Sequence, residues 1–544
     1  MVPPPVMITP DSPVLPMSPL PSSHFLSQPR SASVRPAGTV DTATLNAHDF
    51  DVDNRTGFMP FDQPISRLSG EYEIWEELMD EAQEKRLQLG RRPDLTQEQR
   101  DDSEAWRARV RSTPIISPES LNASEVHLRR AHCVLAWTMH FYIQSQPPPP
   151  PELAQSDIII PSSIAVPLVA ISSQLQLPVV LTYSDDVLYN WRLKNPVPKP
   201  ITPTAPDDLL PMSPGSAFFP RTPFSASSIP QTPFSAAYFT PLSSPLPEEE
   251  DEDEVNMPKL DNISCVTLFT GSKDEEEFYL SSARCELAGV PALEAMRATM
   301  DELFVGDALS RKRIVRYLNA LAGHIDVLAA QLLAVREGCD PEAFYHDIRP
   351  WFMGQDSSPT GRKWIFEGVP PEDQPLELSG PSAGQSSLVH ALDVFLGISD
   401  YSHGAGAGDR KVGPTFLDRM QTYMPRHHRA FLRHLAAAPR PLRALIDDWI
   451  EREPALGEAY NAAVSAMKRF RDGHMRIVAL YIMGPARRER ERQAVLAEQA
   501  ALAEGSADAV PEKKPLKGTG GTDLVQFLKG VRDRTAAAAV SLPR

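Results

Sequence analysis

Apolar residues recur at helical spacing through much of the second half of the chain. One stripe follows a three–four spacing and consists of Ile314, Leu318, Leu321, Ile325, Leu328 and Leu332. This spacing predicts a long helix with one buried side. Further helices are predicted near residues 385–397, 415–436, 441–452 and 456–483, with Gly and Pro signals between them. We therefore predict that residues 261–544 form a larger, all-helical domain.

The amino-terminal part has mixed patterns. Helical spacing occupies residues 73–89 and 124–144, whereas the apolar residues 158–180 are predicted to be extended. We interpret residues 46–196 as a smaller domain, mixed or helical in structure. The predicted fold class is mainly α, with two domains of unequal size.

Two stretches are too poor in periodic apolar residues to fold. Residues 1–45 are a Pro- and Ser-rich tail, and residues 197–260 are a low-complexity linker or inserted arm that ends in an acidic run. Both are predicted to be disordered. The Ser-Pro and Thr-Pro pairs of the tail are either sites for proline-directed kinases or low-complexity drift, and both interpretations stay open.

Composition narrows the class of protein. The chain of 544 residues has a formal net charge of −17, which argues against unspecific binding to nucleic acid or an anionic membrane. Its apolar stretches are short or broken by proline, and its amino terminus lacks the pattern of a secretory signal. Four scattered cysteines fit a reducing compartment better than a disulfide scaffold. We expect a soluble cytoplasmic monomer with no nucleic-acid or membrane partner.

His474 is the strongest candidate for chemistry. It lies on a helical stripe formed by Met467, Phe470, Ile477, Val478 and Tyr481. A histidine on such an apolar face is either a haem-iron ligand or a core histidine with its hydrogen bonds satisfied. His390, His427, His428 and His434 lie on less apolar faces, and His427 and His428 are predicted to begin a helix in contact with solvent.

Several segments carry a family resemblance. They are Ser163–Pro167, Tyr183–Trp191, Ser382–Ser387, Tyr423–Pro425 followed by His428-Arg429 and Phe431-Leu432, and Lys517–Asp523. Together with His474, and in this order, they resemble the indoleamine 2,3-dioxygenase family in a fungal-type form. The resemblance runs from residue 46 to the carboxyl terminus. It is interrupted at residues 197–260 and again at residues 487–516. The second interruption looks like a charged helix followed by a small-residue loop.

The resemblance implies an oxidoreductase of tryptophan catabolism. Such an enzyme uses haem b to insert both atoms of O2 across the C2–C3 bond of L-tryptophan, which gives N-formylkynurenine for the kynurenine pathway towards NAD. No residue is expected to act as a general acid or base. The alternatives are a catalytically inactive haem-binding sensor and a helical scaffold whose Pro-rich arms recruit partners.

The resemblance also assigns site residues. It makes His474 the proximal ligand of the haem iron, supported by Asp393 and Arg471. The residues assigned to the substrate side are Phe141, Phe278, Ser282, Phe344, Arg349, Ser382 and Ala383, with Gly518 and Thr519 in a mobile lid at 517–523. The chain departs from the family at Pro381, where a second glycine is common, and at Phe141, where tyrosine is frequent. Both departures bear on substrate preference.

Overall fold

The computed structural model describes residues 50–154, 156–197, 256–358, 361–398, 416–438, 440–504 and 524–543. The chain divides into two units, one made of Met1–Lys194 and Met257–Arg544 and the other of Asn195–Asn256. The predicted tail, most of the predicted arm and the predicted lid lie outside the described residues. The division of the first unit into a smaller and a larger domain stays a prediction.

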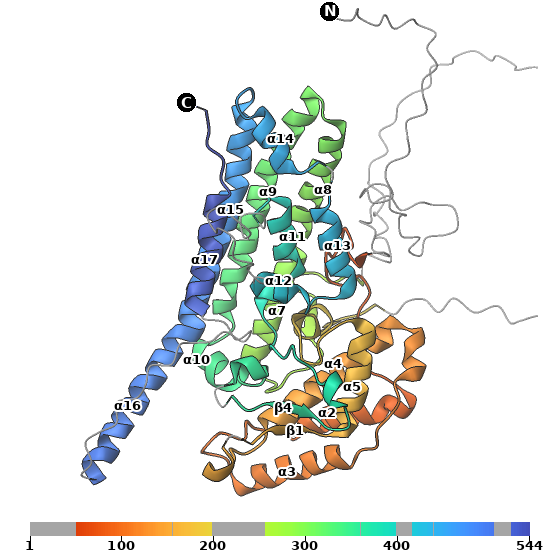
Figure 1. The fold of residues 1–544 in the computed structure, drawn as a ribbon, viewed down its shortest axis with the longest axis vertical. Helices are drawn as coiled ribbons and strands as arrows, with labels where there is room; N and C mark the ends of the chain where they lie inside the picture. Colours follow the sequence, from red (N-terminus) through yellow and green to blue (C-terminus); the bar gives the residue numbers. More distant parts are fainter. Residues whose placement is uncertain are drawn as a thin grey trace, which may run out of the picture. The chain divides into compact units, whose positions relative to one another are not determined.

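The mainly α fold class is confirmed (Figure 1). The α-helices are α2 (Glu73–Glu84), α3 (Gln97–Ser112), α4 (Glu125–Gln144), α5 (Ser162–Leu175), α7 (Lys273–Ala288), α8 (Val290–Val305), α9 (Ala308–Ala334), α10 (Pro341–Ala343), α11 (Ser387–Phe395), α12 (Phe416–Gln421), α13 (Arg426–Ala436), α14 (Leu442–Trp449), α15 (Pro454–Val478), α16 (Gly484–Glu504) and α17 (Leu524–Ala537). The 3-10 turns are η2 (Gly70–Tyr72), η3 (Glu119–Ala123), η4 (Pro151–Leu153), η6 (Val335–Glu337), η8 (Gln355–Ser357), η9 (Pro371–Asp373) and η10 (Ala383–Gln385). Three turns are π-helical, namely η5 (Ser184–Leu188), η7 (Phe344–Ile348) and η12 (Ala479–Met483).

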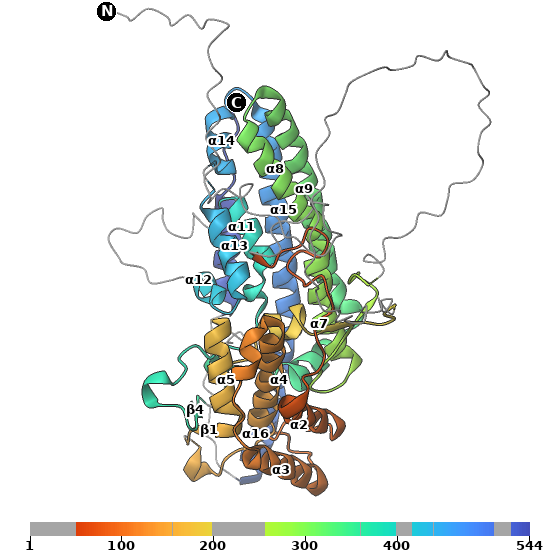
Figure 2. The same ribbon diagram turned by 90° about the vertical axis from the view of Figure 1, so that its right-hand side faces the viewer.

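Helices α9 and α15 run side by side along the bundle (Figures 1 and 2). α9 begins where the side chain of Asp307 accepts a hydrogen bond from the Ser310 amide, an ordinary N-cap. The residues of its predicted stripe from Ile314 to Leu328 are buried, whereas Leu332 faces a cavity. By length and composition alone, Ala308–Glu337 could cross a membrane. Here its apolar stripe packs in the protein core.

Two of the predicted helix boundaries were wrong. Residues 415–436 form two helices, α12 and α13, because Pro425 caps α13 and disfavours a helical conformation at Met424. The helix predicted over 456–483 is α-helical as far as Val478 and then widens into the π turn η12. This turn changes which side chains face the bundle.

The prediction that residues 158–180 are extended was wrong. β1 covers only Ile158–Ile160, and α5 follows with Ile164, Leu168, Ile171 and Leu175 buried at helical spacing against α3 and α4. Pro167 lies inside this helix and costs it a backbone hydrogen bond. Burial of the stripe outweighs that cost.

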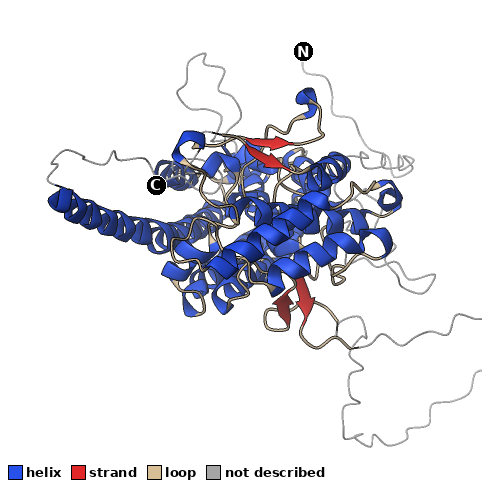
Figure 3. Cartoon of the chain, turned by 90° about the horizontal axis from the view of Figure 1, so that it is seen from below, coloured by secondary structure: helices blue, strands red, loops and turns tan. Residues whose placement is uncertain are grey.

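The described residues form four short strands, which Figure 3 shows in red. β1 pairs in parallel with β4 (Trp364–Phe366), and β2 (Trp191–Leu193) pairs antiparallel with β3 (Ile263–Cys265). β3 and β4 lie in the part for which the sequence predicted helices alone. The β2–β3 pair joins Leu193 to Ile263, so the chain leaves this unit and returns to it at neighbouring positions.

Two hydrophobic cores fill the unit. One lies mainly among α2, α3, α4, α5 and α7, and the other among α8, α9, α11, α13, α14 and α15. Phe278 and Ile477 pack against the first core, whereas Val389 and Phe470 pack against the second. The candidate site lies where these two cores meet.

The packing of the bundle predicts that the stability of the protein depends strongly on the buried residues of α9. We expect Leu328→Ala to lower the free energy of unfolding by about 2–5 kcal/mol, since Leu328 is 2% exposed and its loss leaves a cavity. Urea unfolding followed by circular dichroism measures the change. The control is Val327→Ala, whose residue is 50% exposed and whose effect should stay within about 0.5 kcal/mol. Equal effects of the two substitutions would contradict the packing described here.

Candidate active site

A large cavity lies between α7, α11, α15 and α17. Its empty volume is about 1710 Å³, including the mouth that is open to solvent. This volume exceeds the range of about 300–1,000 Å³ that is usual for small-molecule pockets. Among its lining residues are His474, Arg471, Asp393, Phe278, Ser282, Phe344, Arg349, Ser382 and Ala383. The structure therefore brings together the described site residues that the sequence named, apart from Phe141.

Aromatic rings form one wall of the cavity. The ring centroid of Phe278, on α7, lies 4.4 Å from that of Phe344 and 6.0 Å from that of Phe352. The Phe344 ring also meets the Tyr481 ring edge-on at 5.7 Å. Because these rings fill the space around one another, this wall excludes water and offers a flat aromatic ligand several stacking surfaces.

The three π turns of the described residues all contribute to the cavity. η5 supplies Asp186 and Val187, η7 supplies Phe344, and η12 supplies Tyr481 and Ile482. A π turn holds one more residue than an α-helical turn, so it shifts the side chains that follow it to another face. Such turns are frequent at functional sites, and here they set the direction of the lining residues.

Arg349 places a cation in this apolar cavity. It is the residue directly after η7, it is 8% exposed, and its guanidinium carbon lies 5.8 Å from the centre of the Tyr345 ring. Its Nη1 also lies 3.9 Å from the sulfur of Met353. Burial lowers the pKa of Arg349 from its usual value. A buried guanidinium at a cavity suits a ligand carboxylate, which it can bind with two parallel hydrogen bonds.

Small residues hold the loop with Ser382 and Ala383 close to the aromatic wall. A Cβ atom on Gly380 would lie 2.2 Å from the carbonyl oxygen of Phe352, and one on Gly354 would lie 2.3 Å from the amide of Gly380. The two backbones can therefore cross only because both positions are glycine. Pro381, a position at which the chain departs from the family, follows Gly380 directly and lines the cavity.

His474 lies on the cavity side of α15 and is the only one of the five histidines named from the sequence that lines the cavity. Burial, followed by the charge of Arg471, lowers the pKa of His474 to about 4. Its imidazole has no hydrogen-bond partner among the described residues. A neutral imidazole with a ring nitrogen available at a cavity is the form that binds a metal ion.

Asp393 and Arg471 form a buried ion pair beside His474. Nη2 of Arg471 donates to both carboxylate oxygens of Asp393, at 2.6 and 2.5 Å, and the pair joins α11 to α15. Asp393 makes no hydrogen bond to His474 in the described structure, so it would act on His474 through Arg471. Nη1 of Arg471 is buried and has no partner among the described residues. This atom is available to an acidic group of a ligand.

One of the other histidine predictions was wrong. His428 is buried rather than in contact with solvent, because it shares the inner face of α13 with Phe431, Leu432 and Leu435. Its Nε2 lies 3.2 Å from the carbonyl oxygen of Asp51, and burial lowers its pKa to about 4.

His390 is buried as well. Its Nε2 donates to the Gly384 carbonyl at 2.9 Å. His427 is partly exposed and lies 3.3 Å from Glu125. His390 is thus a core histidine with its hydrogen bonds satisfied.

The structure also corrects the place of Phe141. This residue is fully buried and does not line the cavity. Its ring packs against Phe269 at 4.8 Å and Trp351 at 5.3 Å, in the core around α4. The predicted lid residues Gly518 and Thr519 lie outside the described residues.

Sequence reasoning missed a buried polar cluster beside the cavity, of which Tyr183 is the member that lines it. Tyr183 donates through its hydroxyl to Glu286 at 2.9 Å, and the Ser386 hydroxyl donates to the same carboxyl oxygen at 2.7 Å. Burial raises the pKa of Glu286 to about 7. Tyr183 stands in the segment 183–191 that carried part of the resemblance, but only the fold shows which side chains of that segment face the cavity.

Comparisons with known proteins identify the family of the chain. The family model for indoleamine 2,3-dioxygenase matches residues 46–213 and 247–538. The chain belongs to the indoleamine 2,3-dioxygenase family. Similar proteins include the indoleamine 2,3-dioxygenase of Saccharomyces cerevisiae, 29% identical over 89% of this chain and 91% of the relative, and indoleamine 2,3-dioxygenase 1 of Rattus norvegicus, 28% identical over 80% and 86%. A 6-hydroxytryptophan 2,3-dioxygenase of Fusarium equiseti is 26% identical over 91% of this chain and 98% of its own length.

Membership settles the general activity. Enzymes of the indoleamine 2,3-dioxygenase family are haem-dependent oxidoreductases that act with O2 on tryptophan or related indoles. The cavity is compatible with that chemistry, since it combines a neutral histidine, an aromatic wall and a buried guanidinium.

The buried ion pair yields a prediction. We expect Asp393→Ala to destabilise the protein by about 3–5 kcal/mol, because it leaves the Arg471 cation buried without its counter-ion. Haem affinity should also fall by about 10- to 100-fold, as it does when the partner of a metal ligand is lost. Urea unfolding and haem titration measure the two effects.

Asp447→Ala is the matched control. Asp447 pairs with Arg443 on the surface of α14, with 55% and 23% of the two side chains exposed, so its loss should cost less than about 1 kcal/mol. Wild-type haem affinity in Asp393→Ala would show that Asp393 does not position His474.

Proposed function

We propose that this protein cleaves the C2–C3 bond of L-tryptophan with O2 to give N-formylkynurenine. The observation that carries the proposal is the position of His474 and Arg349 in one aromatic cavity. The first suits an iron ligand and the second suits a substrate carboxylate. We further propose that the enzyme is cytoplasmic and contains haem b.

The cavity fits a haem in three respects. His474 offers a neutral imidazole with no other partner among the described residues, Nη1 of Arg471 suits a haem propionate, and the lining around them is mainly apolar. His474 would hold the iron, and Asp393 would fix Arg471 one helical turn away. When bound, haem supplies the iron that activates O2 for insertion into the indole ring.

The protein's own residues bind and orient the substrate. Arg349 would bind the amino-acid carboxylate, while Phe278 and Phe344 would hold the indole and exclude water. Ser282, Ser382 and Ala383 are small and leave room for the ring. On the resemblance alone, Gly518 and Thr519 would approach the ammonium and carboxylate groups as a lid. Positioning is the task of these side chains, so we assign none as a general acid or base.

A haem-binding sensor without activity fits the cavity less well. A sensor has no need of a buried guanidinium directed at a substrate carboxylate. One relative, named a 6-hydroxytryptophan 2,3-dioxygenase, favours a related alternative in which the preferred indole carries a ring hydroxyl. That alternative concerns the substrate and leaves the reaction class unchanged.

The assignment of His474 is tested by His474→Ala. We expect the purified variant to lose haem, or to keep a weakly absorbing pigment without turnover, because the proposed protein bond to iron is removed. The Soret absorbance relative to the protein absorbance measures haem content. His427→Ala is the control, since His427 lies outside the cavity and should be dispensable for haem. Normal haem content and activity in His474→Ala would overturn the assignment.

The role of Arg349 is tested with two substrates. Arg349→Ala should keep its haem but turn over tryptophan more slowly, by roughly 10- to 100-fold in kcat/KM, since a charge-assisted hydrogen bond contributes about 1.5–3 kcal/mol. Arg349→Lys should restore only part of the loss.

Tryptamine lacks the carboxylate and serves as the control substrate. Its turnover should change little between the wild type and Arg349→Ala. If tryptamine were affected as strongly as tryptophan, Arg349 would not bind the carboxylate.

A further inference from the structure

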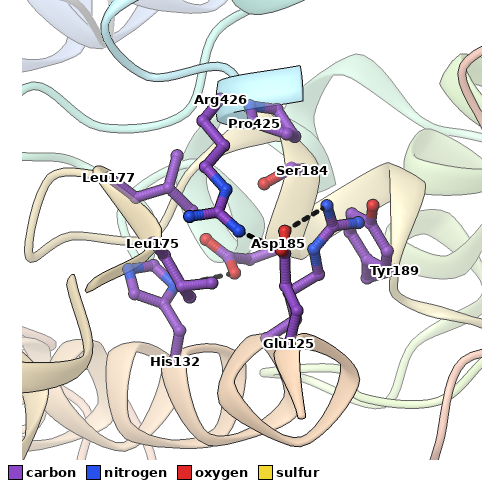
Figure 4. A pocket seen from close by; sticks show the side chains of 10 residues that line it. Glu125, His132, Leu175, Leu177, Ser184, Asp185, Tyr189, Pro425 and Arg426 are labelled. Atoms are coloured by element: carbon purple, nitrogen blue, oxygen red, sulfur yellow. Dashed lines mark hydrogen bonds and ion pairs between the residues drawn. The ribbon is translucent and has the colours of Figure 1, made fainter. Parts of the chain in front are cut away.

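Two neighbouring carboxyl groups on η5 have opposite surroundings. Asp185 lines a small separate pocket, shown in Figure 4, where its Oδ1 accepts a hydrogen bond from Nδ1 of His132 at 2.9 Å. Its Oδ2 accepts from the amide and hydroxyl of Thr182, at 2.9 and 2.7 Å. Asp186, the next residue, instead lines the large cavity that holds His474 and Arg349.

Asp186 is a buried acid with no partner. It is 4% exposed, and neither of its carboxyl oxygens makes a hydrogen bond to any described residue. Burial, followed by the charges of Asp185 and Glu275, raises the pKa of Asp186 well above its ordinary value. Burial therefore favours the uncharged form of this carboxyl, which has one O–H donor and one C=O acceptor.

A second polar group of the same cavity is only weakly paired. The hydroxyl of Tyr279, on α7 next to Phe278, is buried, and the Glu275 carboxyl lies near it without completing a well-formed hydrogen bond. Burial, followed by the charges of Glu275 and Asp186, raises the pKa of Tyr279 well above its usual value, so its hydroxyl is also neutral. Buried polar groups in proteins nearly always have partners, and exceptions at a cavity point to a ligand.

We propose that Asp186 determines specificity by hydrogen-bonding a hydroxyl group on the indole ring of the substrate, with the Tyr279 hydroxyl as a second partner. The inference rests on the proposed function and names the substrate class more closely. It applies to a tryptophan-like substrate that carries a ring hydroxyl.

The number of donors and acceptors favours a hydroxyl over the indole N–H. An N–H can only donate, so it would satisfy the C=O of Asp186 and leave the carboxyl O–H without a partner. A hydroxyl donates to the C=O and accepts from the O–H at once. An unsubstituted ring would cover the carboxyl with C–H groups, and a site with such unmatched polar groups discriminates against that ligand.

The experiment compares the holoenzyme with four variants. For each protein, kcat/KM is measured for tryptophan and for 4-, 5-, 6- and 7-hydroxytryptophan, and the dissociation constant of each compound is measured from the change in haem absorption. Wild type should favour at least one hydroxylated compound. In Asp186→Val the preference for that compound should fall by about 3- to 10-fold, the effect of one hydrogen bond.

Two further variants test how much each polar group contributes to the preference, and a third serves as the control. Asp186→Asn keeps a donor and an acceptor and should keep most of the preference, whereas Tyr279→Phe should lower it by a smaller factor than Asp186→Val. Val187→Ala, in the same turn and cavity, should change all substrates by a similar factor. The melting temperature of Asp186→Val should not fall below that of wild type, because the carboxyl has no protein partner to lose.

The outcomes separate the two proposals. If wild type turns over none of these indoles, the proposed function fails. If wild type turns over tryptophan but prefers no hydroxylated compound, or if Asp186→Val affects all substrates equally, the hydroxyl contact is wrong and the proposed function stands. A lower melting temperature of Asp186→Val would show that Asp186 has a structural partner and would also overturn the inference.

Discussion

The packing of α15 on α9 is the constraint on which the site depends. Along the inner side of α15, the buried residues Ala459, Ala463 and Ala466 are small, so the helix can pack closely within the bundle. At Gly473 an added Cβ would lie 3.8 Å from Leu333 of α9, so this glycine faces the neighbouring helix. His474 follows directly and, like Leu332 of α9, borders the cavity. The contact between α9 and α15 thus fixes the position of His474, the candidate iron ligand, and the direction in which its side chain points.

The second constraint is the burial of polar groups beside the contact between α9 and α15. Some of them pair with one another, as the hydroxyls of Tyr183 and Ser386 do with Oε1 of Glu286. The side-chain atoms that lack partners in the described structure include Nη1 of Arg471 and the polar groups of Asp186 and Tyr279, and these residues line the cavity. Since an unpaired buried polar group costs about 1–3 kcal/mol, a ligand in the cavity that completed these hydrogen bonds would remove that cost.

The sequence predicts those parts of the site that follow regular helical periodicity. The stripe around His474 and the stripe of α9 obey a spacing of 3.6 residues, so their buried faces can be read directly from the chain. α5 was not predicted as a helix, because its β-branched residues and Pro167 are typical of an extended segment. Its buried apolar residues nevertheless follow helical spacing. Phe141 and His428 could not be placed from the sequence, because long-range contacts with Trp351 and Asp51 decide their surroundings.

The π turns explain why the sequence did not predict the remaining cavity residues either. In η5 the wider turn directs Asp185 towards His132 and its neighbour Asp186 into the cavity, a difference that helical periodicity does not predict. Both ring nitrogens of His132 face acceptors, Asp185 and the carbonyl of Pro178, an arrangement that favours the protonated imidazole. Burial lowers the pKa of His132, but the interactions with Asp185 and the Pro178 carbonyl together raise it above its usual value. A fully hydrogen-bonded pair on the outer side of the turn therefore holds the carboxyl without hydrogen bonds in place on the inner side.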